Sequence, residues 1–306
     1  MGETTPMDTK PLALALSIGL LASGSALGQE AVLEEVVVTA TKRAASLQDI
    51  PVTVSTLSAE TIQDAGITNV VGVANLVPSM TVTTNSNPFN SAVRIRGIGT
   101  SQNDLSLEPS VGLFVDDVYF SRSGIGLAEM TDVERIEVLQ GPQGTLYGKN
   151  TIAGAISVTT KPVDMEGYSG TLAGEVGNYD HRRVEGAVSG PLTDSIGFRL
   201  SGAWVERDGY IENGSGENLN SPDQWHLGGK LLFLPTDSLS IQVNANYVSR
   251  DNTCCGADAV QTQQLEDELV AQGFPLIPND AFDYKTRVDV DSRFKSTASV
   301  VSLVID

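Results

Sequence analysis

The sequence is poor in cysteine, histidine and basic residues, and these shortages exclude several classes of protein. Its 306 residues include two cysteines and two histidines, too few for a zinc site or a disulfide framework. With 19 Lys and Arg against 38 Asp and Glu the net charge is −19, which argues against nucleic acid as a partner because phosphate contacts need clustered basic side chains. Beyond the N-terminus, no apolar run approaches the ~20 residues of a membrane helix. What remains is a glycine-rich, acidic, β-rich protein with a length typical of about two domains.

Residues 1–28 are predicted to be a secretory signal. Lys10 precedes the apolar segment Leu12–Ala22, which is too short to span a bilayer comfortably, and Ala26-Leu27-Gly28 offers a small-residue cleavage site. An N-terminal membrane anchor is the alternative, although no polar flank stops transfer on its far side. We therefore expect the mature chain to lie beyond the inner membrane.

Residues 29–43 contain a short segment with a strong preference for β structure. Three valines, Val36 to Val38, precede a threonine, and charged residues at both ends keep such a strand soluble when it is unpaired. A strand of this kind can add to the sheet edge of a partner protein. The alternative is an ordinary first strand of the domain that follows.

Residues 44–165 are expected to fold as a compact α+β domain. Ser58 can cap a helix that Gly66 ends, and a second helix is expected over Asn69–Leu76. Strands at 111–115 and 118–120 flank Asp116-Asp117, which predicts a tight hairpin. Further strands are expected at 133–139, with Ile136 and Val138 on one face and Arg135 and Glu137 on the other, and at 155–160, after a turn at 141–144.

Three patterns in the sequence resemble parts of enzyme sites, and each lacks an essential residue. The stretch Gly144–Asn150 resembles a phosphate-binding loop, but its first glycine comes one residue too late and Asn150 replaces the required Ser or Thr. Gly97-Ile98-Gly99 lacks the third glycine of a dinucleotide fingerprint. His181 and His226 have no matching Ser or Cys nucleophile. We therefore expect no enzymatic activity, no catalytic residue, no metal site and no cofactor.

After residue 165 apolar and polar residues alternate strictly. Long alternating strands with aromatic residues near their ends are typical of a membrane β-barrel, whose outer face is apolar and whose lumen is polar, while a soluble β-sandwich is the alternative. Links near 191–195 and 235–238 are tight, whereas 208–224 and 250–285 are long, as expected when the two rims of a barrel face different compartments. Cys254 and Cys255 fall in the longest link, where two thiols and a strained vicinal disulfide both remain open. The apolar positions that define the alternation are Ile196, Phe198, Leu200, Trp204, Trp225, Leu227, Leu231, Phe233, Leu239, Ile241, Val243 and Tyr247.

With these segments in place, the chain resembles the TonB-dependent outer-membrane receptors over essentially its whole mature length. The segment Glu35, Val36, Val37, Val38, Thr39 and Ala40 is similar to the TonB box. Signatures of the plug domain are similar to Arg94–Gly97, Val133–Pro142, Leu146–Gly148 and Gly154–Val158. The resemblance implies a signal peptide at 1–28, a TonB box segment at 29–43, an α+β plug domain at 44–165 and the N-terminal part of an antiparallel transmembrane β-barrel at 166–306.

The resemblance also implies a function and partners. It implies active uptake of a scarce ligand across the cell outer membrane, driven by the inner-membrane TonB complex, with outer-membrane lipids around the barrel. The ligand would be a ferric siderophore or another iron complex, with cobalamin, saccharides or other organic compounds as alternatives. A secreted β-sandwich binding or adhesion protein is the alternative of a different class.

Particular residues take roles through the same resemblance. The ligand would contact an apical plug loop with Asn85, Asn87 and Asn90. Arg94, Arg96, Arg135 and Glu137 would pair across the plug and the barrel wall, the alternative being solvated charges on a strand face. The remaining positions of the plug signature are Gly97, Gly141, Pro142 and Gly148.

The strands after residue 165 are too few for a plugged transporter. About six fit there, whereas plugged outer-membrane transporters have ~22. We therefore expect the chain to be the N-terminal portion of a longer receptor. We also expect no additional signalling domain of the kind that some members of the family carry, because Gln29 to Glu34 is too short to hold one.

Overall fold

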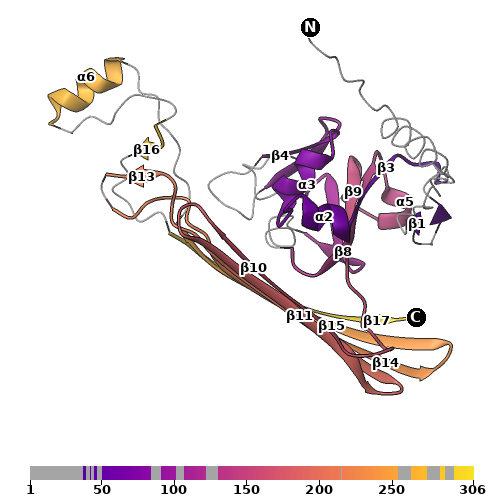
Figure 1. Ribbon diagram of the computed structural model, residues 1–306. Helices are drawn as coiled ribbons and strands as arrows, with labels where there is room; N and C mark the ends of the chain where they lie inside the picture. Colours follow the sequence, from indigo (N-terminus) through magenta and orange to yellow (C-terminus); the bar gives the residue numbers. More distant parts are fainter. Residues whose placement is uncertain are drawn as a thin grey trace, which may run out of the picture. The chain divides into compact units, whose positions relative to one another are not determined.

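The computed structural model describes residues 37–38, 42, 45–46, 50–83, 91–100, 107–121, 130–214, 216–253, 263–273, 283–286 and 293–306. The described residues contain a five-stranded sheet and a six-stranded sheet, drawn from successive parts of the sequence (Figure 1). The predicted signal, Glu35, Val36, Thr39, Ala40, Asn85, Asn87, Asn90, Cys254 and Cys255 lie outside the described residues.

The first sheet and its helices, residues 50–160, are called the N-terminal domain below. β6 and β9 run parallel, and the other neighbouring pairs of this sheet are antiparallel. The strand positions confirm the strands predicted at 111–115, 118–120, 133–139 and 155–160. In order across the sheet the strands are β3 (Val54–Ser58), β8 (Val133–Gln140), β9 (Gly154–Thr160), β6 (Val111–Val115) and β7 (Val118–Phe120), and β4 (Met80–Thr83) pairs with β5 (Ala92–Ile95) in a separate hairpin.

The larger hydrophobic core lies between this sheet and the helices α2 (Ala59–Asp64) and α3 (Val70–Leu76). Val73 from α3 and Ile136 and Val138 from β8 are 0% exposed. Burial of one such side chain stabilises the fold by about 1.5–3 kcal/mol. Ile136 and Val138 share one face of β8, as predicted, and that face packs into this core.

Ser58 caps α2 as predicted, and Asn69, predicted as the first residue of the second helix, is the capping residue of α3. The hydroxyl of Ser58 accepts a hydrogen bond from the Thr61 amide at 3.2 Å, and the Asn69 side chain accepts from two first-turn amides at 3.0 and 3.2 Å. Such caps stabilise a helix by about 1 kcal/mol. Gly66, with a φ of +60°, turns the chain after α2 as predicted. None of the helices in the described part of the chain is long and apolar enough to cross a membrane.

Two turns of the N-terminal domain bear on the site described below. Asp116 and Asp117, with φ of 46° and 65°, form the predicted two-residue turn between β6 and β7, and positive φ at both positions is typical of a type I′ turn. The turn predicted at Gly141–Gly144 is partly wrong. Gly141 turns the chain with a φ of +91°, but Gly144 already begins the short helix α5 (Gly144–Tyr147).

The second sheet is an antiparallel meander of six strands, called the wall below. Tight turns join β11 to β12 and β14 to β15, and long links join β12 to β14 and β15 to β17, as the sequence predicts. Within the described residues the sheet does not close, and β10 and β17 are its edges. In order the strands are β10 (Ser169–Gly177), β11 (His181–Thr193), β12 (Ile196–Glu206), β14 (Asp223–Thr236), β15 (Leu239–Thr253) and β17 (Arg293–Ile305). The long links carry β13 (Glu212–Asn213), α6 (Gln263–Ala271) and β16 (Lys285–Thr286).

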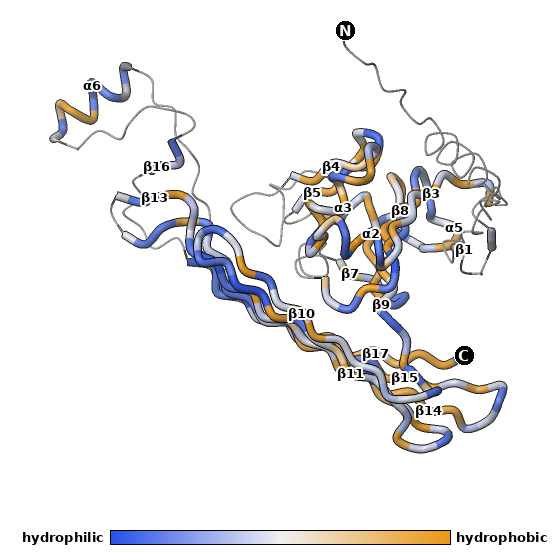
Figure 2. The backbone as a smooth tube through the Cα atoms, in the orientation of Figure 1, coloured by the Kyte–Doolittle hydropathy of each residue, from blue (hydrophilic) through white to orange (hydrophobic). Residues whose placement is uncertain are grey.

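The two faces of the wall differ in polarity. On the outer face large apolar side chains are exposed, among them Leu227 at 54% and Leu303 at 60%. The ring centroids of Trp204 and Trp225 lie 5.9 Å apart near one end of this face, and Phe233 lies on the same face of β14 near the other. Figure 2 shows hydrophilic residues gathered where the strands approach β13 and more hydrophobic residues along the rest of the wall. An apolar face left exposed is the opposite of what a β-sandwich requires, because a sandwich buries such faces against each other.

Candidate functional site

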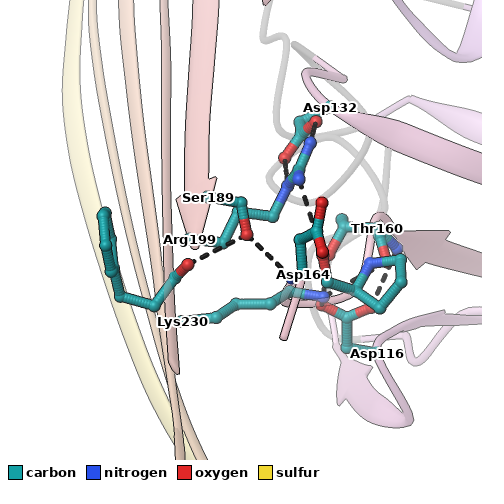
Figure 3. A network of polar contacts seen from close by, with 9 residues as sticks. Asp116, Asp132, Thr160, Asp164, Ser189, Arg199 and Lys230 are labelled. Atoms are coloured by element: carbon teal, nitrogen blue, oxygen red, sulfur yellow. Dashed lines mark hydrogen bonds and ion pairs between the residues drawn. The ribbon is translucent and has the colours of Figure 1, made fainter. Parts of the chain in front are cut away.

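The topology of the first sheet brings three polar groups to one edge. Because β6 is parallel to β9 and β8 is antiparallel to it, the end of β6, the end of β9 and the start of β8 meet there. Asp116 follows β6, Thr160 ends β9 and Asp132 precedes β8. These three residues face polar side chains of the wall (Figure 3).

The wall presents a matching line of polar residues on its inner face. Ser189 on β11 is the register partner of Arg199 on β12, and Arg199 is the register partner of Lys230 on β14. Asn244 on β15 continues the line as the partner of Lys230. Successive residues of a strand point to opposite faces, so register partners share a face.

Asp132 and Arg199 form a bidentate ion pair between the N-terminal domain and the wall. The Arg199 Nε and Nη2 atoms each donate to one carboxylate oxygen of Asp132 at 2.5 Å. A third nitrogen, Nη1, donates to the carbonyl oxygen of Pro162 at 3.5 Å. The side chains of Arg199 and Asp132 are 10% and 6% exposed, so water screens the pair little.

Asp116 and Lys230 form a second ion pair at the same edge. The Lys230 ammonium lies 3.2 Å from the Asp116 carboxylate and donates to the Thr160 carbonyl oxygen at 3.2 Å. Asp116 also accepts hydrogen bonds from the amide and the hydroxyl of Thr160, at 2.9 and 2.6 Å. The charge of Lys230 is therefore balanced by a carboxylate that is itself fixed by two hydrogen bonds.

A third contact involves the segment that joins the two sheets. The Asp164 amide donates to the Ser189 hydroxyl at 2.9 Å, and that hydroxyl donates to the Phe198 carbonyl oxygen at 2.9 Å (Figure 3). Hydrogen bonding by the Ser169 hydroxyl, followed by the amides of Glu166 and Gly167, lowers the pKa of Asp164. The three contacts together hold the N-terminal domain to the inner face of the wall, and we call them the wall contacts.

A cavity of roughly 710 Å³ lies beside the wall contacts. It is lined by α2 and the loop after it, by residues 130–133, and by β10 and β11, with Lys161, Arg183, Glu175 and Glu185 among the charged side chains. Apolar side chains, among them Ile62 and Val133, share this lining with the charged groups.

A second polar cluster lies around Lys42. The ammonium of Lys42 pairs with the Asp117 carboxylate and lies 4.7 Å from the ring centroid of Tyr147 and 5.6 Å from that of Phe114. Burial first, then the negative charges of Glu137 and Asp117, raises the pKa of Tyr147 to about 12. Tyr147 therefore stays neutral at physiological pH and offers Lys42 an aromatic face.

The charged residues with a predicted pairing role make contacts inside the N-terminal domain. Arg94 donates to the Thr83 hydroxyl at 3.2 Å, and Arg96, with a φ of 54°, donates to the Gln140 side chain at 3.1 Å. Arg135 pairs with Glu134 at 2.9 Å and lies 3.6 Å from the Glu137 carboxylate. Their role in gating stays a prediction.

Glu137 does not lie on a solvated face, which corrects the alternative reading of that residue. Its side chain is 0% exposed, because Phe114, Leu139, Tyr147 and Ala155 form a second, smaller core over the same face of β8. Helix α5 supplies Tyr147 to this core. A turn prediction at Gly141–Gly144 could not show that a helix would cover the carboxylate.

The remaining signature positions shape the backbone. Gly97 and Gly148 have φ of +78°, a region that L-residues with side chains seldom occupy, and Pro142 is exposed beside Gly141. Of the box residues, Val37 and Val38 form β1 (Val37–Val38), which pairs antiparallel with β2 (Ala45–Ser46). In the described part of the chain no group of three or more metal-ligating side chains lies together.

Five residues of these sites were not predicted as site residues from the sequence: Asp116, Asp132, Arg199, Lys230 and Lys42. One signal in the sequence pointed to two of them. Arg199 and Lys230 are basic residues at the polar positions of alternating strands, which predicts a place in the lumen. Nothing in the sequence indicates which carboxylate each would meet.

Comparisons with known proteins agree with this architecture. Residues 46–155 match the model of the TonB-dependent receptor plug domain. The chain is 35% identical to the pesticin receptor of Yersinia pestis over 191 residues, which are 61% of this chain and 27% of that protein. It is 28% identical to an iron-regulated outer membrane virulence protein of Vibrio cholerae over 259 residues, 80% of this chain and 38% of that protein.

A solved structure extends the likeness to the fold. The crystal structure of the ferric yersiniabactin uptake receptor from Yersinia pestis superposes with a TM-score of 0.59 at 28% identity, covering 66% of this chain and 32% of the receptor. The chain thus spans well under half the length of the relatives it matches.

Proposed function

Residues 46–155 are a TonB-dependent receptor plug domain and the strands after it resemble outer-membrane receptor barrels, and on this premise we propose that the chain takes part in TonB-dependent uptake of an iron complex. The cell outer membrane is its location, as it is for its relatives. The ligand we propose is a ferric siderophore. The names of the relatives support this choice, since they include a ferric yersiniabactin uptake receptor and an iron-regulated outer membrane protein.

The observation that carries the proposal is the set of buried ion pairs between plug and wall. A carrier that must stay shut without ligand needs contacts that hold the plug in place, and Asp132–Arg199 and Asp116–Lys230 supply them. A receptor that must open also needs contacts that can be broken singly. Ion pairs can keep the receptor closed, because removal of one partner of a buried pair costs about 3–5 kcal/mol. They can also separate when the receptor opens, because water in the lumen then hydrates both charges.

The proposed sequence of events begins at the outer face. A ligand would contact the plug loop with Asn85, Asn87 and Asn90 and the long links of the wall, and would favour the conformation in which the box segment is free. TonB would then add to the strand Glu35–Ala40 and pull. The force would loosen the wall contacts and widen the cavity beside β10 and β11, through which the ligand would pass. Arg94, Arg96, Arg135 and Glu137 would keep the plug itself folded meanwhile.

Deletion of residues 35–40 tests the proposal. In a receptor with a complete barrel, the deletion should abolish uptake of ferric siderophores while ligand binding at the cell surface stays within about twofold of the unmodified receptor, because Val37 and Val38, the described residues of the box, belong to neither of the two large sheets. Both quantities are measured with radiolabelled iron complexes, in cells with and without TonB. Unchanged uptake after the deletion would refute a role for the box.

A panel of ligands tests the substrate class. Cobalamin, saccharides and aromatic compounds are compared with ferric siderophores in cells starved of iron or of carbon. Growth restored by an iron complex supports the proposal, and growth restored only by one of the other classes contradicts it.

A further inference from the structure

The turn Asp116-Asp117 carries two ion pairs that point to different parts of the molecule. The carboxylate of Asp116 binds Lys230 on the wall, and the carboxylate of its neighbour Asp117 binds Lys42. Lys42 lies between β1, which contains two of the box valines, and β2, its partner strand. One two-residue turn therefore contacts both the wall and Lys42, which lies in the sequence between β1 and β2.

The turn is rigid enough to transmit a displacement. Both residues have positive φ, which confines their backbone to a narrow region. The Asp116 amide donates to the Val158 carbonyl oxygen at 2.9 Å, and the Asp116 carboxylate accepts two hydrogen bonds from Thr160. Neighbouring Cα atoms are ~3.8 Å apart, so Asp116 can hardly move without moving Asp117.

The Lys42 end of this connection is held by two kinds of interaction. The ammonium pairs with Asp117, and it also lies over the rings of Tyr147 and Phe114. Asp117 is 68% exposed, so its ion pair alone is weak in water. The aromatic rings add an attraction that an uncharged side chain cannot replace.

We propose that the Asp116-Asp117 turn couples the Lys230 contact on the barrel wall to the Lys42 contact beside the TonB box, so that opening either contact loosens the other. Lys42 acts as a positioning residue, since it fixes the box hairpin to the plug. Coupling of this kind is reciprocal. A change at the wall reaches the box from one side, and a pull on the box reaches Asp116–Lys230 from the other. The proposed function enters only in naming TonB as the source of that pull.

The test measures how readily the box hairpin leaves the plug. A cysteine is placed beside Lys42 by Thr41→Cys, after Cys254 and Cys255 have been replaced by serine, and its reaction with a maleimide is followed in purified receptor with a complete barrel. Lys42→Met keeps the length of the side chain and removes its charge. Loss of the ion pair and of the aromatic contact should raise the labelling rate about tenfold.

A double-mutant cycle then tests the coupling itself. Lys230→Met, on the wall, should raise labelling at position 41 about threefold or more, and the double variant should label no faster than Lys42→Met alone. Arg199→Met breaks the other ion pair to the wall, which does not pass through the turn, and should change labelling less than twofold. Lys149→Met removes an exposed lysine that pairs with Glu108 at 2.9 Å, and it should leave labelling at the starting rate.

Three results of the labelling experiment would refute the coupling. If Lys230→Met leaves labelling unchanged, if its effect multiplies with that of Lys42→Met, or if Arg199→Met acts as strongly, the coupling through the turn is refuted. Lys230→Arg keeps the charge and should label at close to the starting rate, which distinguishes loss of the contact from misfolding. Because labelling needs neither TonB nor ligand, its result is independent of the box deletion, whose failure would refute the proposed function alone.

Discussion

The strongest energetic prediction concerns Arg199. Replacement by methionine leaves the Asp132 carboxylate, 6% exposed, without the two donors that lie 2.5 Å away. Removal of one partner from a buried pair typically costs about 3–5 kcal/mol, chiefly because the remaining charge has lost its solvation and its partner. Both side chains are nearly buried, so little of this cost is relieved by water. We expect docking of the plug to weaken by that amount.

Urea titration of the receptor with a complete barrel measures this cost. Hydrogen exchange of the amides in β8 and β9 reports release of the plug. If the free energy falls by ~2–3 kcal/mol for each molar of urea, the urea concentration at the midpoint should be roughly 1–2.5 M lower in Arg199→Met. Asp132→Asn should have a similar effect, and it keeps a side chain suited to the φ of 59° at that position. The double variant should be only slightly worse than either single one, with a coupling energy of about 2 kcal/mol or more.

Two results would refute this reasoning. A midpoint shift below about 0.5 M in Arg199→Met would mean that the pair does not hold the plug. Additive effects of Arg199→Met and Asp132→Asn would mean that the two residues act separately. Lys149→Met, a change of similar size at an exposed ion pair, is the matched control and should shift the midpoint little.

Two further predictions concern the interior of the plug. The raised pKa of Tyr147, about 12 against an ordinary 10.0, means that its neutral hydroxyl contributes stability fully below pH 10 and loses that contribution as the pH rises to 12. Tyr147→Phe should therefore lessen the alkaline loss of unfolding free energy by about 2 kcal/mol, and identical pH curves for the two proteins would contradict this. Gly154→Ala should lower the unfolding free energy by about 2–3 kcal/mol, because a Cβ atom would lie 2.3 Å from the Leu139 carbonyl oxygen at a φ of +153°. Thermal melting compares Gly154→Ala with the control Gly144→Ala, in which the added Cβ atom would have no neighbouring atom within 4 Å. Equal melting temperatures for the two variants would exclude the clash.

Local features of the fold could be predicted because short segments determine them. Ser58 caps a helix through its own side chain, the start of the second helix could be predicted to within one residue, and Asp116-Asp117 adopts a turn that adjacent residues specify. The alternation of the wall strands also follows from the sequence, since a period of two assigns each residue to a face. Each of these predictions depends on neighbours within a few positions.

The partners of the charged residues could not be predicted, because they depend on distant parts of the chain. Asp132 and Arg199 are 67 residues apart in sequence, and their pairing requires both the strand order of the first sheet and the register of the wall. The burial of Glu137 also could not be predicted, because its carboxylate is covered only when α5 packs over β8. The ion pairs of the wall contacts each join a residue of the N-terminal domain to one of the wall, so no short segment determines them.

The spacing of the aromatic residues on the outer face indicates the thickness of the membrane that the wall can span. Trp225 and Phe233 lie on one face of β14 about 27 Å apart along the strand, at ~3.4 Å per residue. A strand tilt of ~40° reduces this to about 20 Å along the membrane normal. That height is less than the ~30 Å hydrocarbon core of an average bilayer and suits the thinner bacterial outer membrane. Short-chain lipids should therefore accept the protein readily on reconstitution, and long-chain lipids would have to thin around it.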